Sequence, residues 1–255
     1  MASRELSAAL AAARAAAAVT ERLYRSNVAV RIKADRTPVT EADVLAERAI
    51  RAVLETQFPD YGFYGEETGQ SAMEAENIWL VDPIDGTKSF VRDCPFFSTQ
   101  IALRRGGKVI LGVSSASAYG ELAWAEQGGG AFLNGEPIRV SGVSALSEAI
   151  LSTGNLQTLA ASAIGWRRYG ALVGRVNRLR GYGDFLHYHL LARGALDVVL
   201  ESDVNILDIA ALSVIVQEAG GTFTSLDGGG IDLDTTTVLA ANAALHAPLL
   251  AAMRE

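Results

Sequence analysis

Apolar residues recur at two different spacings along the chain, and each spacing predicts a different element. An Ala-rich stretch from Ser3 to about Ser26 predicts a helix, and Thr40-Glu41-Ala42-Asp43 opens a second stretch with apolar residues at helical spacing. Short apolar runs between turn residues are typical of buried strands. Such runs occur at 78–81, 98–103, 108–114 and 121–125, with a Gly106-Gly107 hairpin turn between two of them.

Beyond the Asn134-Gly135 turn, predicted strands and helices alternate. We expect strands at 149–152, 196–201 and 238–241, and helices at 183–193, 206–219 and 246–253, with Gly220-Gly221 ending the second of these helices. The sequence therefore predicts an α/β protein with an α+β first half, about 1–135, and an α/β second half, about 136–255. No linker separates the halves, so we expect one domain spanning 1–255.

Composition and charge narrow the possible functions. Hydrophobic residues make up 49% of the 255 residues, enough for a large core. There are 22 basic and 29 acidic residues, a net charge of −7, and no basic block of the kind that binds nucleic acid. An acidic protein that handled an anionic phosphate ester would need bound cations to offset charge repulsion. We therefore expect a small-molecule substrate, not a nucleic-acid partner.

The cysteine content and the apolar runs predict the cellular compartment of the protein. Cys94 is the single cysteine, which excludes an internal disulfide and a thiolate metal cluster. Glu5 and Arg14 interrupt the Ala-rich start, which favours a helix over a signal peptide. No apolar run approaches the roughly 18–20 residues that span a membrane. We expect a cytoplasmic protein without a membrane partner.

One acidic motif has the chemistry of a metal site. Asp82 and Asp85 flank Pro83-Ile84 at the end of a predicted buried strand. Pro83 stiffens the turn, so both carboxylates and the Ile84 carbonyl can serve as hard oxygen ligands for Mg²⁺. The following Gly86-Thr87 allows close backbone approach and starts a helix whose free N–H groups favour an anion. The alternative is a solvated turn, since Asp, Pro and Gly are common in turns.

Two further acidic positions favour the metal-site interpretation. Glu66 lies in the polar segment Gly65-Glu66-Glu67, and Asp208 interrupts the apolar 206–219 stretch. Asp is unfavourable inside a helix and is rarely buried unpaired, so Asp208 needs either solvent or a cation. Its apolar neighbours Ile206 and Leu207 indicate that Asp208 lies against an apolar surface of the protein and not in open solvent.

The chain resembles the inositol monophosphatase superfamily of Mg²⁺-dependent phosphatases. The resemblance covers nearly the whole chain and rests on four ordered motifs: Thr40-Glu41-Ala42-Asp43, Gly65-Glu66-Glu67-Thr68, Asp82 to Phe90, and Asp208-Ile209-Ala210-Ala211 leading to Glu218-Ala219-Gly220-Gly221. It implies the layered αβαβα sandwich of inositol monophosphatases and fructose-1,6-bisphosphatases. It also implies a homodimer.

The resemblance assigns roles to individual residues. It implies that two or three Mg²⁺ ions are held by Glu66, Asp82, the Ile84 carbonyl, Asp85 and Asp208. It further implies that Gly86 and Thr87 bind phosphate, and that Asp43, Thr87 and Glu66 serve catalysis, the first two by orienting the attacking water. Many relatives carry Trp before the last of these aspartates, where this chain has Leu207. That change alters packing beside the metal but removes no ligand.

The predicted substrate depends on Asp184 and Glu201. Asp184 follows Gly181-Tyr182-Gly183 at a helix start, where it is either an N-cap or part of an acidic end of the pocket with Glu201. This segment, with 195–202, resembles histidinol-phosphate phosphatases of the same superfamily. That resemblance implies hydrolysis of L-histidinol phosphate in histidine biosynthesis, with the carboxylates facing the cationic leaving group. Two alternatives stay open: an inositol-1-phosphate or broad sugar-phosphate phosphatase, and a non-catalytic metal-binding regulatory protein.

Four other titratable positions are weaker candidates. His187 and His189 lie two apart on one predicted helix and do not share a face, which argues against a metal pair. His246 is expected at the surface or at a helix start. Lys88 either attracts phosphate or is solvated, and the solvated alternative is favoured.

Overall fold

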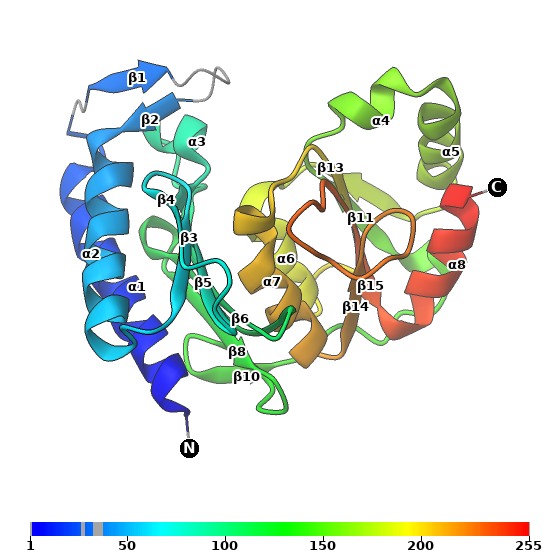
Figure 1. Ribbon diagram of the computed structural model, residues 1–255. Helices are drawn as coiled ribbons and strands as arrows, with labels where there is room; N and C mark the ends of the chain where they lie inside the picture. Colours follow the sequence, from blue (N-terminus) through cyan, green and yellow to red (C-terminus); the bar gives the residue numbers. More distant parts are fainter. Residues whose placement is uncertain (1, 27–28, 33–37, 255) are drawn as a thin grey trace.

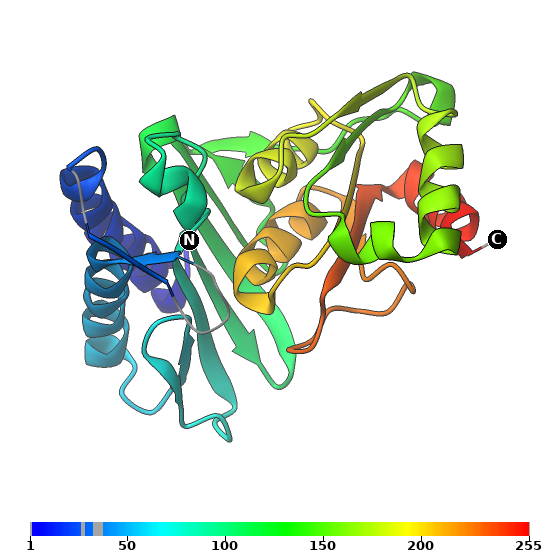
Figure 2. The same ribbon diagram turned by 90° about the horizontal axis from the view of Figure 1, so that it is seen from above.

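The computed structural model describes residues 2–26, 29–32 and 38–254, and its elements stack in five layers (Figure 1). Helices α1 (Arg4–Leu23) and α2 (Glu41–Gln57) cover the outer face of the first sheet. Helices α6 (Asp184–Ala192) and α7 (Ile206–Glu218) lie between the first sheet and the second, and α5 (Ala163–Val173) and α8 (Ala243–Arg254) cover the far side, as the view from above also shows (Figure 2). This is the expected αβαβα sandwich.

The first sheet has eight strands in the order β10-β9-β8-β7-β6-β5-β3-β4. Its strands are β3 (Gly62–Gly65), β4 (Gly69–Ser71), β5 (Asn77–Asp85), β6 (Ser98–Arg105), β7 (Lys108–Ala116), β8 (Glu121–Glu126), β9 (Ala131–Leu133) and β10 (Glu136–Ile138). The four strands expected in the first half are confirmed as β5, β6, β7 and β8. The Gly106-Gly107 turn joins β6 to β7. The sheet ends at Ile138, so the change of architecture falls just after the Asn134-Gly135 turn.

The second sheet has five strands in the order β12-β11-β13-β15-β14 and is mixed. Strand β11 pairs in parallel with both neighbours, whereas β15 is antiparallel to β13 and β14. The strands are β11 (Ile150–Thr153), β12 (Arg178–Arg180), β13 (Val198–Ser202), β14 (Gly221–Thr224) and β15 (Thr237–Asn242). The other described elements are the antiparallel pair β1 (Val30–Ile32) and β2 (Pro38–Thr40), the short helices α3 (Thr87–Val91) and α4 (Gln157–Ala161), and the 3-10 helices η1 (Ser117–Tyr119) and η2 (Leu146–Glu148).

The central helices are held by apolar contacts on both sides. Most of α7 is buried, which fits a helix that is apolar all round. It approaches β7 closely because Gly112 has no side chain: a Cβ there would lie 2.2 Å from the Ala211 carbonyl oxygen. On the outer face, α1 uses small residues in the same way and buries Ala9, Ala12 and Ala16 against the sheet.

Two local expectations are wrong. The strand predicted to end at Val81 continues to Asp85, with a β-bulge between Asp82 and Asp85 that accommodates Pro83, which lacks an N–H. His246 is neither exposed nor at a helix start, because α8 begins at Ala243 and packs on the second sheet. Its Nε2 lies 2.9 Å from the Thr224 hydroxyl.

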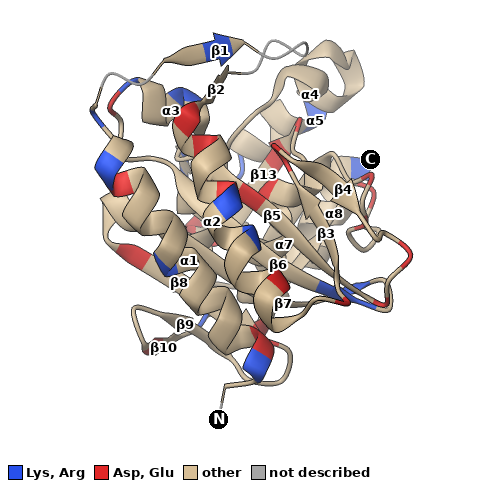
Figure 3. Cartoon of the chain, turned by 60° about the vertical axis from the view of Figure 1, so that its left-hand side comes forward, with Lys and Arg blue, Asp and Glu red and all other residues tan. Residues whose placement is uncertain are grey.

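Charges are interspersed over the outer side of the molecule. Seen from the α1 and α2 side, blue and red residues alternate along the helices and loops (Figure 3). In the ranges that the structure describes, no helix combines the length and apolar character needed to cross a bilayer.

Candidate active site

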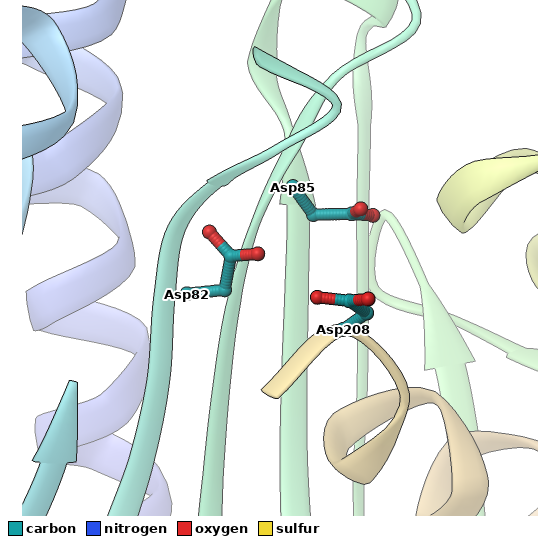
Figure 4. Close-up of side chains that lie close together, drawn as sticks. All are labelled: Asp82, Asp85 and Asp208. Atoms are coloured by element: carbon teal, nitrogen blue, oxygen red, sulfur yellow. The ribbon is translucent and has the colours of Figure 1, made fainter. Parts of the chain in front are cut away.

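Three carboxylates from two elements converge between the first sheet and α7. Asp82 and Asp85 come from the end of β5, and Asp208 comes from the first turn of α7. One carboxylate oxygen from each residue lies within 4.8 Å of the corresponding oxygens of the other two, and the side chains point toward a common space (Figure 4). We call these three residues the acidic cluster. Asp82 is 2% exposed and Asp85 9% exposed, so neither is a solvated turn residue.

The bulge in β5 places the first two carboxylates. Asp82 Oδ1 accepts a hydrogen bond from the Ile84 N–H at 2.9 Å, which folds the turn over the Asp82 side chain. On the neighbouring strand β6, the buried Gln100 amide donates to the Ser98 hydroxyl at 2.8 Å. The Ser98 hydroxyl in turn donates to Asp85 Oδ2 at 3.4 Å. Buried polar groups of β6 therefore orient Asp85.

Asp208 occupies a favourable helical position and not the helix interior. It is the third residue of α7 and forms a capping box, in which Asp208 accepts from the Asn205 N–H at 2.9 Å and the Asn205 side chain accepts from the Leu207 N–H at 3.1 Å. A carboxylate here also complements the positive end of the helix dipole. The cap fixes Asp208 while leaving it beside Asp82 and Asp85.

Burial and mutual repulsion disfavour the ionised forms of the three carboxyl groups when no cation is bound. Burial, followed by the charges of Glu66 and Asp208, raises the pKa of Asp82 well above its ordinary value. Burial, followed by Asp184 and Asp208, does the same to the pKa of Asp85. Burial raises the pKa of Asp208 to about 7. A divalent cation among these oxygens would offset the repulsion, and hard carboxylate donors suit Mg²⁺.

The other residues expected in the metal and phosphate sites line the same cleft. The cleft measures about 370 Å³, and its lining includes Glu66, Asp82, Ile84, Asp85, Gly86, Thr87, Lys88, Asn155, Asp184 and Asp208. Glu66 follows β3, and its N–H donates to the Val81 carbonyl at 3.2 Å across the parallel pair β3–β5. The structure therefore brings together segments separated by more than 140 residues of sequence.

Thr87 connects this cleft to α2. Its hydroxyl lies 2.9 Å from Asp43 Oδ1 and 3.0 Å from the Ile84 carbonyl oxygen. Asp43 is fully buried and also caps α2, since its Oδ2 accepts from the Thr40 N–H at 2.7 Å. Burial raises the pKa of Asp43 despite these hydrogen bonds. Asp43 does not itself line the cleft and contacts it through Thr87.

Asp184 is not the N-cap of α6. The N-cap position belongs to Gly183, and no side-chain hydrogen bond caps the helix. Asp184 has φ +46°, an unusual value for a residue other than glycine, and lines the cleft opposite Lys88. Burial, followed by the charge of Glu201, raises the pKa of Asp184.

Glu201 lies deeper and is held by three donors. It lines a small cavity of about 30 Å³ that also touches Asp85, Asp184 and Asp208. Glu201 Oε2 lies 3.1 Å from His187 Nε2 and accepts from the Tyr188 hydroxyl at 2.8 Å, while Oε1 accepts from the Asn155 N–H at 3.2 Å. Burial alone would raise the pKa of Glu201, but these partners together hold it below its ordinary value.

The two histidines of α6 point to different partners, as their spacing predicts. His187 contacts Glu201, whereas His189 Nδ1 lies 2.8 Å from Glu121 Oε2 and its Nε2 lies 2.9 Å from the Ser114 hydroxyl. Burial lowers the pKa of His189. Sequence reasoning missed the partners Asn155 and Gln100; the only local signal was their place, Asn155 just after β11 and Gln100 near the start of β6.

Comparison with known proteins places the chain in a family. Residues 2–255 match the model of the inositol monophosphatase family, and the chain belongs to that family. It is 44% identical over 202 residues to a histidinol-phosphatase of Mycobacterium tuberculosis, covering 77% of each chain. It is 35% identical over 225 residues to an inositol-1-monophosphatase of Rhizobium meliloti, covering 85% of this chain and 82% of the relative.

A solved structure has the same fold. The crystal structure of extragenic suppressor protein suhB from Bartonella henselae superposes with a TM-score of 0.91 at 31% identity, covering 99% of both chains. The chain is therefore a phosphoric monoester hydrolase of the inositol monophosphatase family. Its acidic cluster lies between the first sheet and α7.

Proposed function

We propose that this chain is a Mg²⁺-dependent phosphatase that hydrolyses L-histidinol phosphate to L-histidinol and phosphate in histidine biosynthesis. The observation that carries the choice of substrate is Asp184, a half-buried carboxylate with no capping role, which lines the cleft next to the acidic cluster and close to Glu201. The 44% identical relative named histidinol-phosphatase supports the same choice.

The residues expected to hold two or three Mg²⁺ ions fit that group. Glu66, Asp82, Asp85, Asp208 and the Ile84 carbonyl all line the cleft, and they are the oxygen donors that Mg²⁺ prefers. When bound, the metal lowers the pKa of a coordinated water and neutralises the leaving oxygen. The protein's part is to hold these donors in place through the β5 bulge and the α7 cap.

Thr87 and Asp43 would orient the attacking water. A threonine hydroxyl has one proton, and when it donates to Asp43 Oδ1 its lone pairs are free to accept from a water in the cleft. Asp43 is fixed by α2, so the Thr87 oxygen is fixed as well. The turn at residue 86 requires glycine: its φ is +91°, and a Cβ there would lie 2.7 Å from the Phe96 carbonyl oxygen. Gly86 and Thr87 would contact the phosphate.

Asp184 and Glu201 would receive the leaving group. Histidinol carries an ammonium group and an imidazole, so a carboxylate beside the metal site would orient it through a charge-assisted hydrogen bond. The same site can take a different ester. Glu201 already accepts from three protein donors, and a carboxylate oxygen can accept from a neutral hydroxyl as well as from an ammonium group. That contact favours an inositol or sugar phosphate as the second candidate, together with the inositol-1-monophosphatase relative.

Asp184→Asn separates the two substrates. Losing one charge-assisted hydrogen bond costs about 1.5–3 kcal/mol, roughly a tenfold to hundredfold loss in kcat/KM for histidinol phosphate. Turnover of inositol 1-phosphate should fall much less. Asp60→Asn, which removes the same charge at an exposed position, is the control. Equal losses on both esters would show that Asp184 is structural and would remove the support for a cationic leaving group.

The oligomeric state is a separate part of the proposal. Family resemblance supports a homodimer, and light scattering on the purified protein measures it. A monomer at working concentration would contradict this part alone.

A further inference from the structure

A line of polar residues on α2 faces the site from the outer layer. Asp43, Glu47 and Arg51 are spaced by four residues, so they lie along one face of the helix. Figure 3 shows α2 with β3 and β4 beside it. Glu47 is fully buried, which is rare for a glutamate unless it is paired. The Asp43 end of this line already touches Thr87, and the role of Glu47 needs an explanation.

Glu47 binds the backbone on the C-terminal side of Glu66. Its Oε2 accepts from the Glu67 N–H at 2.7 Å, and its Oε1 accepts from the Thr68 N–H at 2.7 Å. Both carboxylate oxygens are thus engaged by consecutive amides, and such bonds to an ionised acceptor are about twice as strong as neutral ones. Glu47 therefore fixes the turn from β3 to β4 at the residues just after Glu66.

The residue before Glu66 is shaped to admit this carboxylate. A Cβ on Gly65 would lie 2.5 Å from Glu47 Oε1 and 2.6 Å from both the Glu47 Cδ and the Phe63 ring, so only glycine leaves room for the two side chains. One helical turn further on, Arg51 donates to the Thr68 hydroxyl at 3.0 Å and to the Ser71 hydroxyl at 3.2 Å. It also lies 4.8 Å over the Phe63 ring. Helix α2 therefore contacts both strands of the β3–β4 hairpin and the turn between them.

We propose that Glu47 is a positioning residue for the metal site, which sets Mg²⁺ affinity by holding the backbone that directly follows Glu66 and packing against Gly65 before it. The inference rests on the proposed role of Glu66 as a metal ligand. Glu47 itself does not line the cleft, so it acts through the backbone of 65–68 and not by touching the ion or the substrate. Residues that orient metal ligands typically change affinity strongly when they are replaced.

Glu47→Gln tests this role with almost no change in volume. The amide has one acceptor oxygen, so one of the two N–H groups loses its partner and faces an NH₂ group instead. Titration of Mg²⁺ into the metal-free variant by calorimetry, well below its unfolding temperature, should show a dissociation constant about 10-fold to 100-fold higher than that of the wild type. The rate at saturating Mg²⁺ should fall far less than the rate at low Mg²⁺.

Three further variants make the outcome decisive. Glu21→Gln removes the same charge from an exposed position on α1 and should bind Mg²⁺ like the wild type. Gly65→Ala pushes against the Glu47 carboxylate and should raise the dissociation constant in the same direction, which keeps the test available if Glu47→Gln does not fold. Glu66→Gln should weaken Mg²⁺ binding directly.

The outcomes separate this inference from the proposed function. If Glu66→Gln weakens Mg²⁺ binding while folded Glu47→Gln and Gly65→Ala bind it like the wild type, Glu47 is only a structural residue and the inference is overturned. If Glu66→Gln itself binds Mg²⁺ normally, the ligand role of Glu66 in the proposed function is wrong.

Discussion

The repulsion within the acidic cluster predicts an unusual dependence of stability on pH when no metal is bound. Burial raises the pKa of Asp208 from its ordinary 3.8 to about 7. In the unfolded chain the same group ionises near its ordinary value, so between these two pH values the folded state binds more protons. Stability from this group is complete below pH 4 and is lost as pH rises toward 7. Most carboxylates in proteins have the opposite sign.

The shift sets the size of the effect. About three pKa units at 1.36 kcal/mol each give an upper value of about 4 kcal/mol for the loss at pH 8 relative to pH 4. Asp208→Asn imitates the protonated carboxyl and keeps an oxygen that can accept from the Asn205 N–H, so the cap of α7 survives. The unfolding free energy of the variant should therefore lack the decrease that ionisation of Asp208 causes in the wild type.

Chemical denaturation in EDTA at several pH values measures this loss of stability. The difference in unfolding free energy between wild type and Asp208→Asn should shift by up to about 4 kcal/mol in favour of the variant from pH 4 to pH 8. Taking the difference cancels the buried histidines His189 and His246, whose lowered pKa values act in the other direction. Saturating Mg²⁺ at pH 8 should stabilise the wild type more than the variant. A difference that does not change with pH would refute the reasoning.

Two further changes test other parts of the structure. Asp85→Asn removes a ligand charge and should reduce the Mg²⁺-dependent rate by orders of magnitude, and a near-normal response of the rate to Mg²⁺ would contradict the proposed site. Gly112→Ala places a methyl group 2.2 Å from the Ala211 carbonyl oxygen and should lower stability by about 1–3 kcal/mol, or roughly 2–12 °C in Tm. An unchanged Tm by circular dichroism would mean that α7 and β7 are not packed this closely.

Much of the fold could be predicted because local signals and global packing agree. The Thr40-Asp43 pattern predicts the start of α2, and the structure has a capping box there. The alternation beyond Asn134-Gly135 predicts β11, β13 and β15 of the second sheet and the helices α6, α7 and α8. The edge strands β12 and β14 and the helix α4 were not predicted, since three to five residues carry too little periodicity to stand out from a loop. Helix α5 was also not predicted, because it buries only Tyr169 and Leu172 and so has little apolar periodicity.

The candidate site was partly visible in the sequence. Asp82, Asp85 and Asp208 could be singled out because charges in apolar surroundings need a partner, and the structure brings them together. Glu47 could not be singled out, because a glutamate within a helix is usually solvated and only the packing of α2 on the β3–β4 hairpin buries it. Asp184 allowed two interpretations, and only the position of Gly183 at the helix start excludes the N-cap.

The most direct test of the proposed function is the ratio of kcat/KM for L-histidinol phosphate to that for inositol 1-phosphate, measured on the wild-type protein with saturating Mg²⁺. A ratio well above one, with both rates abolished by EDTA, is expected if Asp184 and Glu201 receive a cationic leaving group beside a metal site. A ratio below one would contradict the proposed substrate, and turnover that persists in EDTA would contradict the metal-dependent mechanism.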